Sequence, residues 1–327
     1  MYWLRTPQKV YFKKGCMFLA LDELKTEYGC KRVLIVTDTG LYKNFAVNAV
    51  EKKLSALGIM HSCYFALGNK VDLSAVKDGA KAASLFEPDA IVAVGGKGVI
   101  SASKLIRVLY ACPEADIARL SESFGDITSR DTVFPQMQKK ILLVAIPTNS
   151  GSGCEMSPFA VVNDGEDKYQ IADYSIMPDV AVIDADFSMN SSQTETASCA
   201  AMILSHALES YFSDRATTYT DGFAIKAIAL VMQYLPSAYE NGSGDPVARE
   251  KLAEASAMSG IAFANAGNLH GVSFESACSF CAVRGFISAM RDVKGADLDR
   301  VQELNKVLGT DNAADKLEAL LNACRDE

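Results

Sequence analysis

Residues 90–104 read AIVAVGGKGVISASK, and this stretch decides the fold of the first half of the chain. Its first five residues form a continuous apolar, partly β-branched run, which predicts a strand buried on both faces of a sheet. The run leads into a Gly-Gly-Lys-Gly turn at 95–98, and we expect a helix to begin near Ser101. Such a turn lets backbone N–H groups and the positive end of a helix dipole approach a diphosphate. Because the pattern is not G-x-G-x-x-G, an ordinary tight turn is the alternative interpretation.

Three more runs of the same kind lie in the first half, VLIVT at 33–37, ILLVAI at 141–146 and VAVI at 180–183. Helical patterns separate them, for example at 46–57. Apolar strands alternating with helices predict a parallel sheet with helices on both faces. Ligands bind such sheets at the carboxyl ends of the strands.

The strand pattern stops after about residue 186. Long, alanine-rich helical patterns follow at 196–212, 217–239 and 246–264, with shorter ones at 298–308 and 313–325. A polar stretch at 186–195 marks the boundary. The sequence therefore predicts an α/β dinucleotide-binding domain at 1–187 and a shortened, all-helical domain at 188–327.

Composition excludes several classes of function. A chain of 327 residues with a net charge of −8 lacks the basic face that nucleic acid requires. No apolar run is long enough to span a bilayer, and the first residues lack the apolar core of a signal peptide. The nine cysteines show no framework of spacings. We therefore expect reduced thiols and a cytoplasmic protein.

A second polar loop follows the run at 141–146 and reads PTNSGSGCE at 147–155. Its hydroxyls, amide and glycines suit hydrogen bonds to phosphate, ribose and a nicotinamide carboxamide. An ordinary polar turn is again the alternative.

The two loops together resemble a known family. GGKGVISASK at 95–104 and PTNSGSGCEMSPFAV at 147–161 are similar to the two loop patterns of the iron-containing alcohol dehydrogenases. WLRTPQKVYFKKGC at 3–16 and KYQIADYSIMPDVAVIDADF at 168–187 resemble the alcohol-dehydrogenase half of bifunctional aldehyde–alcohol dehydrogenases. The resemblance implies a Rossmann-like domain followed by a helical domain, the dehydroquinate synthase-like arrangement. It also implies NAD-dependent interconversion of a small primary alcohol and its aldehyde.

The resemblance implies cofactor-binding residues at matching positions. They are Asp38 for the adenosine ribose, Gly95, Gly96, Lys97 and Gly98 for the pyrophosphate, Thr148 and Asn149 beside the nicotinamide, and Lys168. A carboxylate at Asp38 favours NAD over NADP, because it repels a 2′-phosphate. Several positions depart from the pattern: Lys97 replaces a glycine, Ser101 an aspartate and Asn149 a threonine, and Lys70-Val71 replaces an Asn-Pro near the adenine.

The metal site implied by the resemblance is altered. The family holds a divalent metal with one aspartate and three histidines, of which the first two are spaced D-x-x-x-H on one helix. Here His206 is present, and Met202 occupies the aspartate position. A two-residue deletion after Gly267 aligns His270 with one histidine and Arg284 with another. Two imidazoles without an anionic ligand bind iron or zinc weakly, so His206 and His270 are interpreted as remnants.

Several alternatives stay open at this point. Cys278 and Cys281 form a Cys₂His₂ zinc site with His206 and His270, or they are buried apolar residues. The chain is an alcohol dehydrogenase with impaired or absent metal-dependent turnover, or a non-catalytic nucleotide-binding or assembly relative. A third hypothesis is a metal-independent enzyme that uses Arg284. Expected partners are a small alcohol or aldehyde, and a second copy of the chain or a full-length aldehyde–alcohol dehydrogenase; no catalytic residue is assigned.

Overall fold

The computed structural model describes residues 3–68, 71–122, 134–137, 139–266 and 280–324. The chain divides into two compact units. The α/β unit comprises Thr6–Thr148 and Cys154–Phe187. The helical unit comprises Ser188–Glu327, the short segment Asn149–Gly153 and the N-terminal residues up to Arg5.

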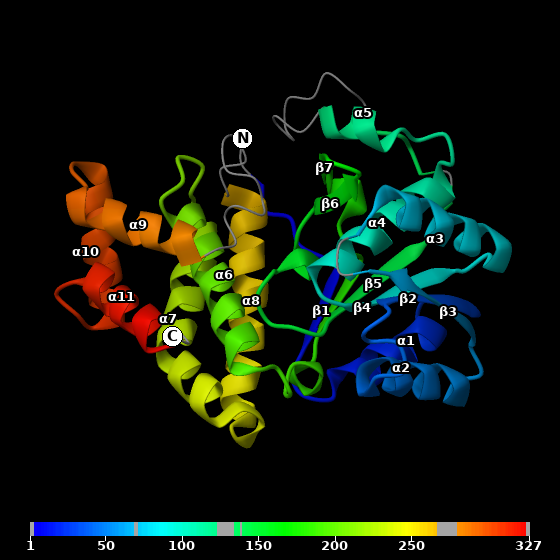
Figure 1. The fold of residues 1–327 in the computed structure, drawn as a ribbon, viewed down its shortest axis with the longest axis horizontal. Coiled ribbons are helices and arrows are strands. Elements are labelled where there is room, and N and C mark those ends of the chain that lie inside the picture. Colours follow the sequence, from blue (N-terminus) through cyan, green and yellow to red (C-terminus); the bar gives the residue numbers. More distant parts are fainter. Residues whose placement is uncertain (1–2, 69–70, 123–133, 138, 267–279, 325–327) are drawn as a thin grey trace. The chain divides into compact units, whose positions relative to one another are not determined.

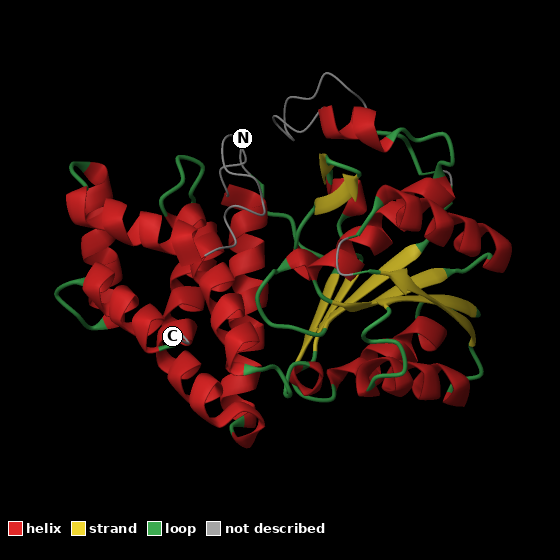
Figure 2. Cartoon of the chain, viewed as in Figure 1, coloured by secondary structure: helices red, strands yellow, loops and turns green. Residues whose placement is uncertain are grey.

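Six parallel strands form the sheet of the α/β unit, in the spatial order β1-β8-β5-β4-β2-β3 (Figures 1 and 2). Their bounds are Lys9–Phe12 (β1), Arg32–Asp38 (β2), Met60–Leu67 (β3), Ala90–Gly95 (β4), Leu142–Pro147 (β5) and Val180–Ile183 (β8). The four strands predicted from the sequence are β8, β5, β4 and β2, which are contiguous at the centre of the sheet. The prediction of a parallel sheet is confirmed.

Helices cover both faces of this sheet, α1 and α2 on one face and α3 and α4 on the other (Figure 1). Their bounds are Cys16–Thr26 (α1), Phe45–Ala56 (α2), Leu73–Phe86 (α3) and Lys97–Ala111 (α4), and a short helix, α5, spans Ile117–Glu122. Beneath α1 and α2, the side chains of Ile35, Val92 and Ile146 form one core with Leu21 and Val47. Burial on both faces explains why the central strands are continuous apolar runs.

Four strands were not predicted. β1 and β3 are the edge strands of the sheet, and β6 (Phe159–Asp164) pairs antiparallel with β7 (Asp167–Ala172) in a separate ribbon. β1, β3 and β7 are partly exposed, so they lack the continuous apolar run on which the prediction depended. β6 begins with four buried apolar residues at 159–162, and the prediction missed this run. The ribbon had a local signal, because Asp164-Gly165 is a typical hairpin turn and Gly165 has a φ of 63°.

The helical unit contains six α-helices in the described part of the chain. They are α6 (Gln193–Tyr211), α7 (Thr218–Asn241), α8 (Pro246–Ala266), α9 (Phe280–Asp292), α10 (Ala296–Leu308) and α11 (Ala313–Ala323). The prediction of an all-helical second half is confirmed over these residues. α6 begins with a capping box, in which Ser192 accepts from the N–H of Glu195 at 3.1 Å and Glu195 accepts from the N–H of Ser192 at 2.9 Å.

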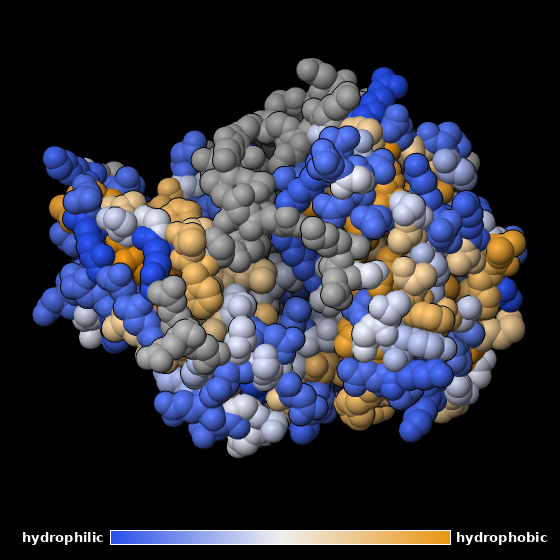
Figure 3. Space-filling model, viewed as in Figure 1, coloured by the Kyte–Doolittle hydropathy of each residue, from blue (hydrophilic) through white to orange (hydrophobic). Residues whose placement is uncertain are grey.

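The surface shown in Figure 3 is a mixture of hydrophilic and apolar residues. In the described part of the chain, no helix combines the length and the apolarity that a bilayer span requires.

Candidate functional site

The carboxyl ends of β2, β4 and β5 lie side by side at one edge of the sheet. β2 ends at Asp38, β4 at Gly95 and β5 at Pro147, and the three strands are paired in parallel. From β2 the chain passes outward to β3 and then returns to the other side of β2 to form β4. Open parallel sheets bind ligands at the strand ends where the order reverses in this way. The predicted neighbourhood of Asp38, the glycine turn and Thr148 is confirmed, and we call it the strand-end site.

Asp38 terminates β2 after a break in regular pairing. The register with β3 shifts between Val36 and Asp38, and such irregularities commonly redirect a side chain. Asp38 is half-buried, and its Oδ1 accepts a hydrogen bond from the backbone N–H of Leu41 at 2.8 Å. The carboxylate is therefore held at the first turn after the strand, and its contact with a ribose stays a prediction.

α4 begins at Lys97, so the prediction of a helix start near Ser101 is wrong. Gly96 is the N-cap with an extended backbone, and Lys97 and Gly98 already belong to the first helical turn. The sequence did not indicate a helix in this turn, because glycine is a weak helix former. The N–H groups of a first turn have no acceptor within the helix, so an N-terminus beside the strand ends can bind an anion.

Close packing leaves little room for a side chain at either end of this turn, which spans residues 95–98. A Cβ added to Gly95 would lie 2.5 Å from Cγ2 of Val99, and one added to Gly98 would lie 3.1 Å from Cγ2 of Val71. The N–H of Thr148 donates to the carbonyl of Gly95 at 3.2 Å. The glycine turn is therefore attached directly to the loop that follows β5.

That loop spans residues 148–153. Its residues Asn149–Gly153 belong to the helical unit, where they pack on α6 and α8. An added Cβ on Gly151 would lie 2.7 Å from Cα of Cys199, and one on Gly153 would lie 2.5 Å from Cα of Gly260. Both glycines are therefore needed for backbone contact with a helix. We call residues 148–153 the β5 loop.

Lys168 lies on β7, opposite Asn163 of β6. The N–H of Asn163 donates to the carbonyl of Val71 at 3.0 Å, and Val71 in turn lies against Gly98. This series of contacts brings the Lys168 end of the ribbon close to the first turn of α4. The contact of Lys168 with a cofactor stays a prediction.

Two buried charged residues in these motifs were missed by the sequence analysis. Lys104 is fully buried, and its Nζ donates to the carbonyls of Cys154, Ser157 and Phe159 at 2.8, 2.8 and 2.7 Å. Burial lowers the pKa of Lys104 to about 8. The signal available was a charged residue within a stretch of small and apolar ones, which marks a side chain with a specific partner when the stretch is buried.

Glu155 is the second of these residues and is 1% exposed. Burial raises its pKa to about 7, against the opposing attraction of Lys104. Among the described residues, its Oε2 has no hydrogen-bond partner. Ser101, which stands where the resemblance expects an aspartate, is also buried without a partner for its hydroxyl in the described part of the chain.

The implied metal positions on α6 are Met202 and His206, one helical turn apart as predicted. His206 is fully buried, and its ring stacks on that of Phe263 with centroids 4.5 Å apart. A thioether is a poor ligand for Fe²⁺ or Zn²⁺ compared with a carboxylate. The described residues contain no group of three or more His, Cys, Asp or Glu placed to hold a metal ion. Met202 therefore supplies no anionic ligand beside His206, and the altered metal site stays a prediction.

The other implied positions fall near α9. Arg284 lies on α9, and its guanidinium donates to Oδ1 of Asn322 on α11 at 2.8 Å. Cys281 is exposed. His270 and Cys278 lie outside the described residues, so the roles assigned to them, and the two-residue deletion, stay predictions.

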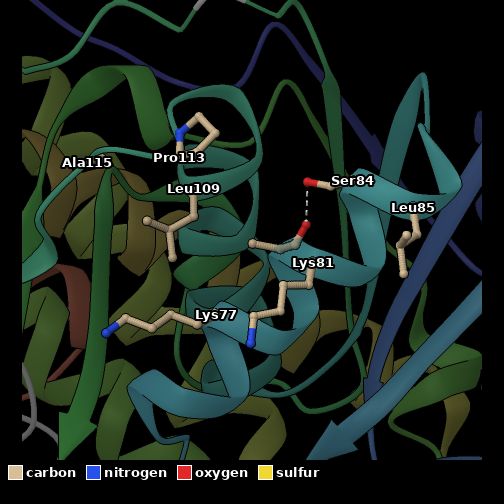
Figure 4. A pocket seen from close by; sticks show the side chains of 8 residues that line it. Lys77, Lys81, Ser84, Leu85, Leu109, Pro113 and Ala115 are labelled. Carbon is tan, nitrogen blue, oxygen red and sulfur yellow. Dashed lines mark hydrogen bonds between the residues drawn. The ribbon is translucent and has the colours of Figure 1, made fainter.

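A separate groove of about 610 Å³ lies between α3 and the residues at and after the end of α4 (Figure 4). It is lined by Lys77, Ala80, Lys81, Ser84, Leu85, Leu109, Pro113 and Ala115. None of these residues belongs to the glycine turn or the β5 loop, so the groove is distinct from the strand-end site.

A parallel sheet with its strand-end site, followed in the chain by an all-helical unit, defines an α/β protein with an NAD-binding type of fold. Residues 7–185 match the family described as iron-containing alcohol dehydrogenase, and residues 196–325 match its C-terminal part. The chain belongs to the iron-containing alcohol dehydrogenase family.

Known relatives refine this assignment. The chain is 38% identical to the bifunctional aldehyde-alcohol dehydrogenase AdhE of Escherichia coli, over 89% of this chain and 33% of that protein. It is 42% identical to an aldehyde-alcohol dehydrogenase of Clostridium acetobutylicum, over 81% of this chain and 31% of that protein. The chain thus spans about a third of the length of these relatives. The structure of an iron-containing alcohol dehydrogenase from Thermococcus thioreducens superposes with a TM-score of 0.82 at 26% identity, covering 100% of this chain and 89% of that one.

Proposed function

We propose that the chain binds NAD at the strand-end site and interconverts a small primary alcohol with its aldehyde. The observation that carries the proposal is the placement of Asp38, the N-terminus of α4 and Thr148 at adjacent ends of parallel strands. The names of the relatives support the substrate class, because they are aldehyde-alcohol dehydrogenases. They give no support to the alternative of a non-catalytic assembly relative.

Calorimetric titration with NAD and NADP tests the nucleotide part of the proposal. We expect NAD to bind more tightly, because the Asp38 carboxylate repels a 2′-phosphate. Asp38→Asn removes that charge with little change of shape, so it should reduce the difference between the affinities for NAD and NADP. Tighter binding of NADP to the unaltered protein would contradict the role given to Asp38.

We propose further that metal-dependent turnover is impaired, with His206 and His270 as remnants and Met202 and Arg284 at the other ligand positions. The thioether of Met202 beside a fully buried His206 supports this proposal. An arginine remains protonated near neutral pH and cannot coordinate a cation.

Metal analysis of protein purified with iron or zinc present, together with an ethanol and NAD assay, tests this part. We expect a content well below one metal ion per chain. Met202→Asp with Arg284→His should raise metal content before it raises activity, whereas the control Met202→Leu should change neither. Stoichiometric metal in the unaltered protein, with ordinary turnover, would show that the ligands have been misread.

We propose a cytoplasmic location and association with a second copy or with a full-length aldehyde–alcohol dehydrogenase. No disulfide joins any two of the eight described cysteines, which supports a reducing compartment. Phe12, Phe18 and Phe45 of the α/β unit are exposed aromatic residues, a residue type that is enriched at protein interfaces. Light scattering of the chain alone and mixed with such an enzyme tests the association, and a monomer in both would contradict it.

A further inference from the structure

Lys104 lies on α4, about two turns after the glycine turn at its N-terminus. Its ammonium donates to three backbone carbonyls, those of Cys154, Ser157 and Phe159. An ammonium group has three N–H donors, so the full donor capacity of this buried side chain is used. All three acceptors belong to the short segment that immediately follows the β5 loop.

The β5 loop is therefore held at both of its ends by β4 and α4. At its start, the N–H of Thr148 donates to the carbonyl of Gly95 at 3.2 Å. Just past its end, the carbonyl of Cys154 accepts from Lys104 at 2.8 Å. Asn149–Gly153 lies between the two attachments. The helix whose N-terminus is expected to bind the diphosphate thus also fixes one end of the loop expected to contact the nicotinamide, and β4 fixes the other.

An apolar side chain at position 104 would remove the ammonium donor from three buried carbonyls, of which that of Cys154 also accepts from the N–H of Ser157 at 3.3 Å. Hydrogen bonds from a charged donor are stronger than neutral ones, and an unsatisfied buried acceptor is costly. Although burial lowers the pKa of Lys104, the value of about 8 still leaves the ammonium protonated at neutral pH. The nearby Glu155 carboxylate favours this charged form.

We propose that Lys104 is a positioning residue for the nicotinamide end of NAD and acts through the β5 loop. This inference rests on the NAD binding proposed above. Lys104 does not itself touch the nucleotide; it sets the geometry of the segment that carries Asn149.

The variant Lys104→Met, which keeps the length of the side chain and removes its donors, tests the proposal. We expect the Kd for NAD, measured by calorimetry, to rise about tenfold, as for the loss of a charged hydrogen bond. Double variants show whether Lys104 acts on NAD binding through the β5 loop. Asn149→Ala should weaken NAD binding in the unaltered background and have little further effect beside Lys104→Met. Asp38→Asn, at the other end of the nucleotide, should have the same effect in both backgrounds.

Arg107→Met provides a matched structural control. Arg107 is a second buried cation on α4, and it donates to Asp179 at 2.8 Å and to the carbonyl of Ser175 at 2.6 Å. Its partners lead to β8 instead of the β5 loop. We expect Arg107→Met to lower the thermal midpoint, Tm. In the Arg107→Met background, Asn149→Ala should still weaken NAD binding as much as it does in the unaltered protein.

The outcomes separate the two proposals. Failure of the unaltered protein to bind NAD overturns the proposed function and this inference with it. The inference alone is overturned if Lys104→Met has the same Kd for NAD as the unaltered protein. It is also overturned if Lys104→Met diminishes the effects of Asp38→Asn and Asn149→Ala on NAD binding equally. If Lys104→Met does not fold, the double variant Lys104→Met/Glu155→Gln leaves no isolated buried charge and carries the same measurements.

Discussion

Replacing Gly260 with alanine should destabilise the helical unit, because the new methyl group would meet backbone atoms. A Cβ at this position of α8 would lie 2.7 Å from both Cα and the carbonyl oxygen of Gly153, closer than the 3.0 Å that real Cβ contacts respect. Gly153 has a φ of 58°, a left-handed conformation that glycine adopts without strain, so its backbone can lie directly against α8. Either α8 or the β5 loop must be displaced.

The expected magnitude follows from two opposing effects. Alanine in a helix interior is more favourable than glycine by about 0.5–1 kcal/mol. Overpacking of a close contact costs about 1–3 kcal/mol. At the middle of both ranges, the net loss in the free energy of unfolding is about 1 kcal/mol, a shift of about 5-fold in the folding equilibrium.

Gly222→Ala is the matched control, because Gly222 also lies within a helix, α7, and has no atom within 4 Å of an added Cβ. This variant should gain about 0.5–1 kcal/mol. Urea unfolding followed by circular dichroism gives both values, with separate transitions fitted separately if the two units unfold independently. A Gly260→Ala protein as stable as the unaltered one would refute the reasoning.

Three further predictions concern the described residues. Burial raises the pKa of Glu155 to about 7, above the ordinary 4.5, so its ionisation costs stability as the pH rises between these values. Glu155→Gln should remove that loss, so that in urea unfolding its advantage over the unaltered protein is larger at about pH 8 than at about pH 5. Gly95→Ala, whose methyl would lie 2.5 Å from Val99, should raise the Kd for NAD by about tenfold or more, and by more than Gly98→Ala; equal calorimetric affinities would contradict this. Ser192→Ala removes the capping box of α6 and should cost about 1 kcal/mol of unfolding free energy, seen as a lower Tm.

The sequence by itself predicted the features that depend on local order along the chain. The central strands are buried on both faces, so each is a continuous apolar run that can be recognised without knowledge of its neighbours. The long helices have their own period, and the two glycine-containing loops stand where strands end. Met202 and His206 could be placed one turn apart because a helix sets that spacing.

Only the tertiary structure decided the features that join distant parts of the chain. The strand order places Asp38 beside Gly95, although many residues separate them, because pairing is a long-range contact that no local period encodes. The edge strands and β7 formed through pairing with partners, since their own apolar pattern is weak. The start of α4 at Lys97 was settled in the same way, by packing that outweighs the low helix propensity of glycine. The role of Lys104 was likewise invisible in the sequence, because its three acceptors are backbone carbonyls, which every residue possesses, and folding alone selects which ones lie within reach.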